Sequence, residues 1–592
     1  MKTRLKIFTP ILSVLACCAF LPQMQAVVPA PDGCYPGFTT AEGCRALESL
    51  TTGEGNTGLG FWSLILDTTG QNNTGVGAQS LAMNNGDLNT AVGVVSLVFN
   101  LTGSENTAVG AQTLPFNDGD ANGAFGAYAL FNNTDGFSNN AFGDSALFSN
   151  IHGLGNVAIG DNALFSNDSS GNSSGNFNTA VGHFALTDNI DAFGNTAVGS
   201  GALRNNDSTG NGVANGNTAV GNDAMISNID AFNNTAVGFR ALFFNDATGA
   251  DLANGNTAVG SGALLFNTDA FNNTAVGAFA LLNNDSTGNG LGNQNTAVGI
   301  NALNSNTDGA SNTAVGSQAL FSNDSSLNTA VGFQSLFTNF SGLENTAIGD
   351  QALLDNIDGD FNVAVGGAAL LANMAGNDNT ACGGGALNDT TGNDNTALGF
   401  QAGILATTGD GNVYIGSGMS GVAGESNHTY IRNIKDTTVS GAGTDAVTVN
   451  LTTGLLGHLT SSRRYKEDIR PMDKASEAVF ALKPVTYHYR KEIDPSQSPA
   501  FGLIAEDVAQ VNPDLVARNS KGQAESVHYE MVNAMLLNEF LKEHRKVEKL
   551  EATVAQQHKD FEAAVAELKG QIQKVSAQLE ASKPAPQVVN NP

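Results

Sequence analysis

The chain has 592 residues, with 70 glycines and only 14 prolines, so it is long enough for several domains. Its 55 acidic and 26 basic residues give a formal net charge of −29, and about 18 basic and 19 acidic residues follow Thr460. Almost all the excess negative charge therefore lies on the first 460 residues, and a surface of that sign argues against nucleic-acid partners because it repels phosphate backbones.

The first 26 residues have the pattern of an export signal. Three basic residues precede the apolar run 7–21, Pro22 ends that run, and Ala26 offers a small-residue cleavage site. The run is too short and too soon interrupted for a membrane span. Export predicts an extracellular or cell-surface protein, and a lipid-attachment box ending at Cys17 is the alternative, which would anchor the protein by a lipid.

Three cysteines follow this signal, at Cys34, Cys44 and Cys382. Cys34 and Cys44 could close a small disulfide loop in an oxidising compartment. Cys382 replaces valine in a repeat and is predicted to be a small buried hydrophobe. The cysteines and histidines show no metal-ligand spacing, so no cofactor is predicted beyond weak Ca²⁺ binding by acidic loops.

The segment 56–431 consists of about 21 copies of the pattern NTAVGxxALxxN followed by a polar turn. The copies are 16 or 17 residues apart, except between Asn156 and Asn312, where the spacing alternates between 22 and 17 because every second copy carries an insert such as DSTGNG at Asp207. So short a period cannot hold a helix pair and predicts a β-solenoid with two short strands and two turns per coil. At about 4.8 Å per coil the rod would be about 100 Å long.

Alternation along a strand places Thr and Val on one face and Ala on the other, and the Ala-Leu pair of the second strand divides in the same way. Repeated Asn at the corners is expected to form amide ladders. If Val and Leu face outward, one rod exposes long apolar stripes of the kind that mark association surfaces, and three chains could cover them. The alternative is a monomeric solenoid with Val and Leu inside and Ala outside. Ice or mineral binding through Thr rows is disfavoured, because Thr occurs once per coil and is replaced at Val157 and Val363.

At residues 89–93 and their copies, the pattern NTAVG resembles the AxG repeats of trimeric autotransporter adhesin heads. The resemblance implies a trimeric parallel β-roll on a bacterial surface. The membrane anchor of that family is not expected here, because the C-terminal part of the sequence is helical and charged.

The composition changes after the repeats. Val447, Val449 and Leu451 alternate as in a strand and predict a neck, and four basic residues then follow Ser461 within ten positions. Beyond them the sequence predicts a helix at about 472–481, a strand in PVTYHYR, and a strand followed by an acidic helix in FGLIAEDVAQVNPDLV.

The segment from Tyr529 to about Ala581 contains no helix breaker. Its apolar residues are spaced mostly by threes and fours with a shift near Phe561, which is coiled-coil spacing with a stutter. The alternative is one long amphipathic helix that covers the core of the C-terminal domain itself.

Four ordered blocks in this region resemble the endosialidase-type intramolecular chaperone, the autoproteolytic C-terminal domain of phage tail spikes and fibres. The blocks are Ser461 with Arg463-Arg464-Tyr465-Lys466 and Ile469, ALKPVTYHYR from Ala481, FGLIAEDV from Phe501, and the terminal helix. The resemblance implies a trimeric chaperone that folds a β-rich fibre and then cuts itself off, just before the serine of a serine–lysine pair spaced five residues apart. Carried onto this chain, the catalytic pair is Ser461 and Lys466, and the scissile bond is Thr460–Ser461.

The chemistry of such a pair is reasonable. A serine hydroxyl is a poor nucleophile until a base takes its proton, and a lysine amine serves as that base when burial or nearby cations lower its pKa. Arg463, Arg464 and Arg470 would supply the cations, and assembly would supply the burial. Ser462 and Tyr465 stand where the family often has an acidic and an aliphatic residue, and the spacing of five selects Ser461 of the two adjacent serines.

The sequence therefore predicts a mainly β protein: a parallel β-solenoid rod followed by a small α+β domain and a coiled-coil helix. The predicted parts are a signal peptide (1–26), an N-terminal cap (27–55), the solenoid (56–431), a neck (432–460), the chaperone and autoprotease domain (461–534), the coiled coil (535–582) and a tail (583–592).

The predicted function is that of an exported homotrimeric surface fibre, adhesin-like, whose C-terminal domain cleaves itself off. One alternative is an uncleaved fibre whose tail is a trimerisation cap, and another is a spike that binds a receptor or glycan. Glycan cleavage would need paired carboxylates on a concave surface, and the repeats show no isolated pair of this kind.

Overall fold

A computed structural model describes residues 36–434, 437, 439, 446–451 and 453–582. The predicted signal, Cys17, Cys34 and the tail 583–592 lie outside these residues, so the lipid anchor and the Cys34–Cys44 disulfide stay predictions. The chain divides into two compact units, one ending at Asp436 and the other beginning at Thr437.

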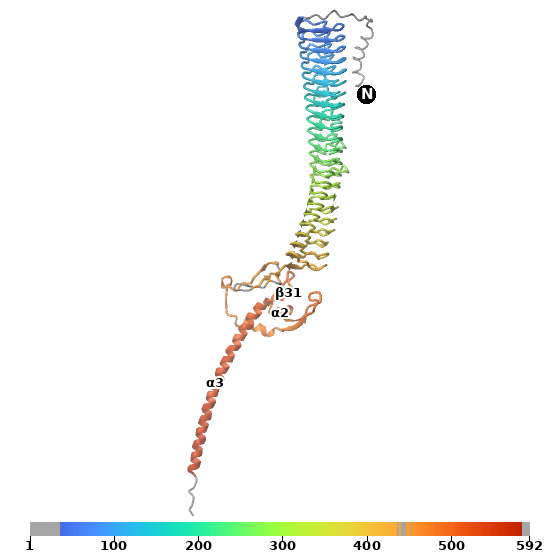
Figure 1. Ribbon diagram of the computed structural model, residues 1–592. Coiled ribbons are helices and arrows are strands. Elements are labelled where there is room, and N and C mark those ends of the chain that lie inside the picture. The colour runs from blue at the N-terminus through green and yellow to red at the C-terminus, as the bar shows by residue number, and fades with distance from the viewer. Residues whose placement is uncertain (1–35, 435–436, 438, 440–445, 452, 583–592) are drawn as a thin grey trace, which may run out of the picture. The chain divides into compact units, whose positions relative to one another are not determined.

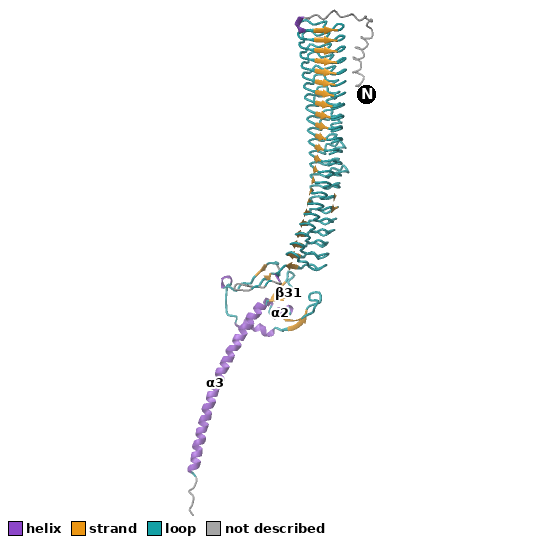
Figure 2. Cartoon of the chain, viewed as in Figure 1, coloured by secondary structure: helices purple, strands orange, loops and turns teal. Residues whose placement is uncertain are grey.

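The first unit is a parallel β-solenoid, which confirms the predicted fold class. Within the described residues, 23 three-residue strands form one parallel sheet, one strand from each coil (Figures 1 and 2). The strands are β1 (Thr40–Glu42), β2 (Thr57–Leu59), β3 (Thr74–Val76), β4 (Thr90–Val92), β5 (Thr107–Val109), β6 (Gly123–Phe125), β7 (Asn140–Phe142), β8 (Val157–Ile159), β9 (Thr179–Val181), β10 (Thr196–Val198), β11 (Thr218–Val220), β12 (Thr235–Val237), β13 (Thr257–Val259), β14 (Thr274–Val276), β15 (Thr296–Val298), β16 (Thr313–Val315), β18 (Thr329–Val331), β20 (Thr346–Ile348), β21 (Val363–Val365), β22 (Thr380–Cys382), β23 (Thr396–Leu398), β24 (Val413–Ile415) and β25 (Thr429–Ile431).

The strands stack in strict register, so that equivalent residues of successive coils are paired. Thr196, for example, pairs with Thr218, and the Ala and Val that follow pair in the same way. The sheet already begins at β1, within the segment 27–55, and a short 3-10 helix, η1 (Pro36–Phe38), precedes it.

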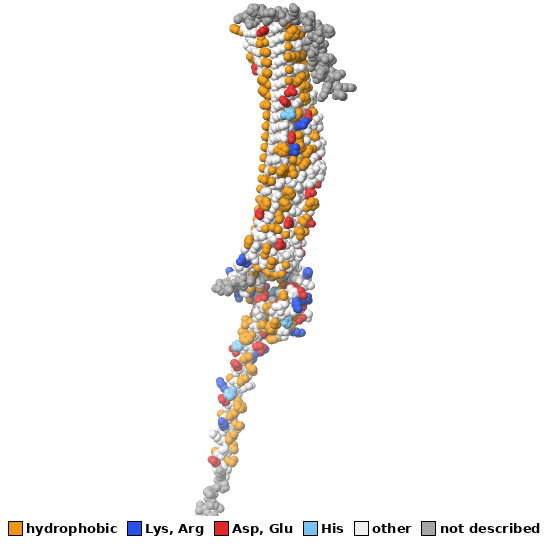
Figure 3. All heavy atoms as spheres, turned by 45° about the vertical axis from the view of Figure 1, so that its right-hand side comes forward, with side chains coloured by type: hydrophobic (Ala, Val, Ile, Leu, Met, Phe, Trp, Pro, Cys, Tyr) orange, Lys and Arg blue, Asp and Glu red, His pale blue; other side chains and the backbone are white. Residues whose placement is uncertain are grey.

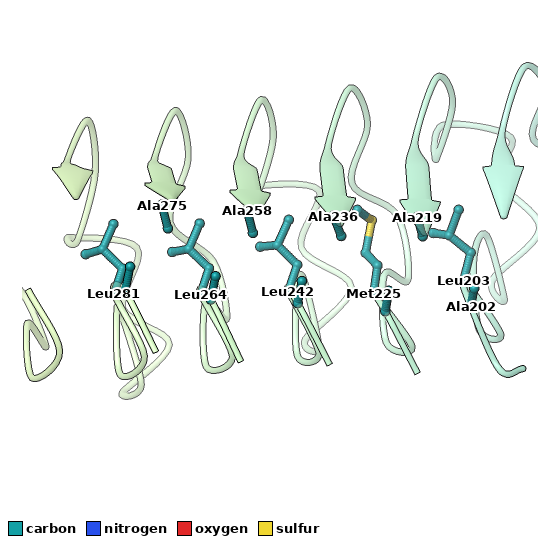
Figure 4. Close-up of a cluster of buried hydrophobic side chains, with 14 of the residues drawn as sticks. Ala202, Leu203, Ala219, Met225, Ala236, Leu242, Ala258, Leu264, Ala275 and Leu281 are labelled. Carbon is teal, nitrogen blue, oxygen red and sulfur yellow. The ribbon is translucent and has the colours of Figure 1, made fainter. Parts of the chain in front are cut away.

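The core of the rod is narrow and consists mainly of alanine and leucine. The Ala in the middle of most strands is buried, and so are the Ala and Leu of the opposite leg, for example Ala219 facing Ala202 and Leu203 (Figure 4). The Val at the end of each strand points outward instead, with Val198 and Val220 38% and 37% exposed. Both predicted arrangements are therefore wrong, because each placed Val and Leu on the same side. In the structure Val faces outward and Leu faces inward.

The predicted second strand is also wrong for most coils. In a strand, two adjacent side chains point to opposite faces, but the adjacent Ala202 and Leu203 are both fully buried. The leucine achieves this with a left-handed backbone, at φ +49° for Leu203 and +50° for Leu242. This leg is thus a series of turns, and the two-residue strands β17 (Ser322–Asn323) and β19 (Thr338–Asn339) are its short parallel pair.

The corners contain the predicted ladders of buried asparagine. Asn256 shows the pattern: its backbone N–H donates to Asn234 Oδ1 (2.8 Å), its own Oδ1 accepts from the N–H of Asn273 (2.9 Å), and its Nδ2 donates to the Ala270 carbonyl (2.9 Å). A second ladder lies beside it, in which Asn245 Nδ2 donates to Asn228 Oδ1 (2.7 Å). Each amide satisfies backbone groups that the tight corner would otherwise bury without a partner.

The longer coils carry their inserts after a buried aspartate, at Asp168, Asp207, Asp246 and Asp285. Asp246 accepts the N–H of Asp230 on one oxygen (2.7 Å) and the N–H of Ala250 on the other (3.1 Å). Burial, and to a lesser extent the neighbouring carboxylates of Asp230 and Asp269, raise the pKa of Asp246 to about 6.

This aspartate makes the stability of the rod depend on pH. Folding raises the pKa of Asp246. The aspartate therefore stabilises the folded rod fully below its unfolded pKa of about 4, and this stabilisation is lost as the pH rises through about 6. The rod should therefore unfold more readily at pH 7.5 than at pH 5. Asp246→Asn should raise the free energy of unfolding at pH 7.5 by about 1 kcal/mol and weaken its dependence on pH, since the amide oxygen still accepts the N–H of Asp230 although the longer bond from Ala250 is lost.

Urea unfolding of both proteins at several pH values measures this effect. Asp251→Asn is the matched control, because Asp251 is an exposed residue of the same insert. A pH profile that is the same in Asp246→Asn and in the unaltered chain would contradict the prediction.

The C-terminal end of the rod is closed by aromatic side chains. Tyr414 takes the place of the core alanine, is fully buried and stacks on Tyr430 with ring centroids 5.7 Å apart. Glu425 accepts both hydroxyl groups, from Tyr414 at 3.2 Å and from Tyr430 at 2.7 Å. These three side chains cap the apolar core at its last coils.

Cys382 lies at the outward position of β22 and is a free, exposed cysteine. The prediction that it is buried was wrong, because it replaces the valine that faces out and not the alanine that faces in.

The second unit is small and mixed in secondary structure, and its elements lie close to their predicted positions. They are β26 (Thr448–Val449), β27 (Leu456–Gly457), η3 (Arg463–Tyr465), η4 (Asp473–Ala481), β28 (Val485–His488), β29 (Pro499–Gly502), α2 (Ala505–Val511), η5 (Pro513–Leu515), β30 (Val516–Arg518), β31 (Ala524–Val527) and α3 (Tyr529–Ala581). The pairs β26–β27, β28–β29 and β30–β31 are antiparallel, and η4 is a 3-10 helix where the sequence predicts an ordinary one.

The buried core of this unit joins α2, β30 and β31 to the first turns of α3. Its members are Val508, Leu515, Val516, Val527, Val532 and Met535. Among the helices that the structure describes, none combines the length and the apolar character of a membrane span.

Candidate functional site

The predicted cleavage site lies on an exposed part of the chain between the hairpin β26–β27 and η3. Thr460 and Ser461 are exposed. Ser462 begins η3 as its N-cap: its Oγ accepts from the backbone N–H of Arg464 (3.4 Å) and from Nε of the same residue (3.2 Å). The hydroxyl of Ser462 is thus engaged locally, whereas that of Ser461 has no hydrogen bond to any described residue.

Lys466 ends the same short helix. Its backbone N–H donates to the Arg463 carbonyl (3.2 Å), and its side chain is exposed. The single turn of η3 therefore separates Ser461 from Lys466 along the chain, but within the described residues no hydrogen bond joins the hydroxyl to the amine. The described residues thus show the predicted pair as two exposed side chains that are not hydrogen-bonded to each other.

The predicted cationic surroundings are also exposed. Arg463, Arg464 and Arg470 lie on the surface, and the guanidinium of Arg464 lies 5.5 Å from the ring centroid of Tyr465, itself 68% exposed. Solvent screens exposed charges of this kind, so the arginines alone do not create the low-dielectric surroundings that a lysine base needs.

A second serine–lysine cluster, which sequence reasoning missed, lies between η4 and α3. Ser476 is fully buried and donates to Glu539 Oε1 (2.5 Å), and Lys542 Nζ donates to the same oxygen (2.5 Å) and lies 3.2 Å from Ser476 Oγ. Asn538 Nδ2 also donates to Ser476 Oγ (2.7 Å). The hydrogen bonds from Lys542 and Ser476 hold the pKa of Glu539 below its ordinary value.

This cluster fastens η4 to α3 and has no access for a substrate, because its serine is enclosed. The only sequence signal for it is the spacing of Asn538, Glu539 and Lys542, which places three polar residues on one side of the helix.

Two apolar surfaces of this unit are left open. One is a groove of about 660 Å³ between η4, β28, β29 and α3, whose lining includes Leu482, Leu536 and Phe501, the last 79% exposed. Apolar side chains in so exposed a position are typical of association surfaces.

The other open surface is the apolar stripe of α3. The buried residues of α3 are Val532, Met535 and Glu539, and all three lie among the first eleven residues of the helix. Beyond Lys542 the stripe is exposed, with Leu550 63%, Phe561 66% and Leu579 66% accessible. The alternative that the whole helix covers the domain's own core is therefore wrong for this part of α3.

No group of three or more His, Cys, Asp or Glu side chains in the described part of the chain is arranged to hold a metal ion.

Residues 461–517 match the model of a protein family described as chaperone of endosialidase. The matched segment begins at Ser461, includes Lys466 and ends in β30, so it covers three of the four blocks on which the resemblance rests. The C-terminal unit of this chain thus contains a chaperone-of-endosialidase domain, which follows a long β-solenoid. Comparisons with curated proteins and with solved structures found no match.

Proposed function

We propose that the chain is an exported β-solenoid fibre whose C-terminal domain brings three copies together and then cleaves the Thr460–Ser461 bond. The observation that carries the proposal is the chaperone-of-endosialidase match, which begins at Ser461 and contains Lys466. The open apolar groove and the uncovered stripe of α3 support it, because both are surfaces that other copies would cover.

In the proposed reaction, Lys466 Nζ takes the proton of Ser461 Oγ, and the oxygen attacks the carbonyl carbon of Thr460. The peptide bond breaks as an ester forms between Thr460 and Ser461 Oγ, and the freed α-amino nitrogen takes up a proton. Water then hydrolyses the ester, which leaves a carboxylate on Thr460 and a hydroxyl on Ser461.

Assembly is the step that would make this chemistry possible. In one chain the hydroxyl and the amine are exposed and apart, so a general base at Lys466 needs neighbouring copies to bury it and to close the distance. Cleavage would then report correct assembly, since only an assembled tail would cut.

The fibre that remains would be displayed outside the cell, after removal of residues 1–26, as a surface adhesin or coat element. Lipid attachment at Cys17 would hold it at the membrane, and the ligand would be a receptor or a glycan.

Replacing the proposed nucleophile tests the reaction. The unaltered chain should appear on a denaturing gel as two fragments, one that ends at Thr460 and one that begins at Ser461. Ser461→Ala should remain intact, with a rate of cleavage lower by at least about 10³-fold. Ser462→Ala is the matched control: it removes only the cap of η3, which is worth about 1 kcal/mol, and should still cleave.

N-terminal sequencing of the smaller fragment should read Ser-Ser-Arg-Arg. An intact chain in all three proteins would instead leave the tail as an uncleaved trimerisation cap, and cleavage of Ser461→Ala at the same bond would exclude Ser461 as the nucleophile.

A further inference from the structure

The outward side of the parallel sheet, which we call the valine face, is uncharged along almost its whole length and carries a continuous row of apolar side chains. It consists of the first and third residues of the strands from β2 to β25 in that sheet. The third residues are Val, Ile, Leu, Phe or Cys, and no first or third residue of these strands is charged. Within the described rod, Glu42 of β1 is the charged exception that precedes the face.

The other sides of the rod do not share this property. The leg that carries Ala and Leu is interrupted by Arg204 and Asp355, and the corner before the strands carries Glu105 and Asp378. Figure 3 shows columns of hydrophobic side chains along the rod, with acidic and basic side chains scattered between them. In a chain with a net charge of −29, a face without charge along 22 consecutive strands is exceptional.

The size of the face fits a stable interface. At about 4.8 Å per strand and about 3.3 Å per residue, it covers on the order of 1,000 Å² of one rod. The largest apolar patch on a typical monomer is about 300–600 Å², and a specific interface buries about 800 Å² on each partner. The valine face, whose area includes the row of Thr as well as the apolar third residues, is therefore large enough to hold two rods together.

We propose that the valine face is the surface through which copies of this rod pack side by side, parallel and in the same register. A flat apolar face that repeats at every coil is best matched by a partner with the same repeat, and the rod itself is such a partner. The proposed function gives the uncovered stripe of α3 the same occupant, a second copy of the chain. Every rod is joined at the same end, its C-terminal one, to the unit that contains α3, so copies held together at that unit have the same ends of their rods close to one another.

The repetition also explains why such an interface needs a helper. Eleven of the strands read Thr-Ala-Val, so two rods displaced by one coil would lose only about one contact in 22. The face has few landmarks that would oppose a slip, the clearest being the stacked rings of Phe125 and Phe142, 4.6 Å apart. The register must therefore be set mainly at the C-terminal unit, and this part of the inference rests on the proposed function.

Disulfide trapping in the full-length chain tests the proposal, because Cys382 already lies on the valine face. One protein keeps Cys382 as its single cysteine, with the others replaced by serine. A second carries Val298→Cys instead. The matched control carries Ser227→Cys, at a half-buried residue of the opposite leg. Each protein is oxidised with diamide and run on a non-reducing gel.

Both face cysteines should give covalent dimers, at least about fivefold more than Ser227→Cys, and no larger product, since each chain has one thiol. Equal cross-linking of the control, or no dimers from either face cysteine, would overturn the proposal. Light scattering and the cleavage fragments of the same proteins keep this result separate from the proposed function. If the protein is trimeric and cleaved but gives no cross-links through the valine face, the proposed interface is wrong and the proposed function stands.

Discussion

Deleting residues 196–234 should leave a folded rod that is shorter by two coils. The deletion joins Asn195 to Thr235, and both junction residues keep their places in the repeat because a 22-residue and a 17-residue coil are removed together. The strands β9 and β12 then pair as β9 and β10 do now, and the asparagine ladders continue. In a solenoid each coil contacts only its neighbours, so the midpoint of thermal unfolding should change by no more than a few degrees.

A smaller deletion should do more damage. Removal of residues 196–225 joins Asn195 to Ile226 and places Asn195 nine residues before Asn234, whereas successive ladder asparagines are otherwise 16 to 22 residues apart. So short a segment cannot complete a coil, and the sheet is broken beyond β9. Circular dichroism and thermal melts of the two proteins give the comparison. A 39-residue deletion that unfolds the rod as badly as the 30-residue one would contradict the coil-by-coil account.

Placing charges on the stripe of α3 should abolish assembly. In Leu550→Glu with Val554→Glu, both residues are more than half exposed in the single chain, so the change should leave helix and domain folded. In a coiled coil the same side chains are buried, each worth about 1.5–3 kcal/mol per chain. The expected product in light scattering is a single chain that is no longer cleaved at Thr460–Ser461.

Ala552→Glu with Ala555→Glu is the matched control, because it adds the same two charges to the other side of the helix. This protein should assemble and cleave like the unaltered chain. If both double variants behave alike, the stripe of α3 has no part in assembly.

The sequence is sufficient to predict the rod because its period is so short. One copy every 16 or 17 residues leaves room for one coil, and the positions of Asn and Gly identify its corners. The second leg could not be predicted, since Ala-Leu reads equally well as a strand, and only the left-handed backbone at residues such as Leu203 allows both side chains to face the core. The same ambiguity explains the wrong expectation for Cys382. Whether its side chain is buried depends on which residue of the strand Thr380–Cys382 faces the core.

In the C-terminal unit, the order of the elements could be predicted from hydrophobic patterns and prolines, and the limits of α3 follow from the absence of helix breakers. The cluster of Ser476, Glu539 and Lys542 could not, because Ser476 is more than 60 residues away from the other two in sequence and meets them only through folding. The pair Ser461 and Lys466 stays a prediction, since both side chains are exposed and no hydrogen bond joins them within the described residues.

The central claim is that a removable C-terminal domain brings three copies of the rod together in one register. The most direct measurement is the mass of two purified proteins in light scattering: the product of the full chain, and a chain that ends at Thr460. The full chain should yield a fibre of three rods with the C-terminal fragment separated from it, and the chain ending at Thr460 should give single rods or aggregates. A stable single rod from the full chain, or an equally stable trimer from the shortened one, would contradict the account.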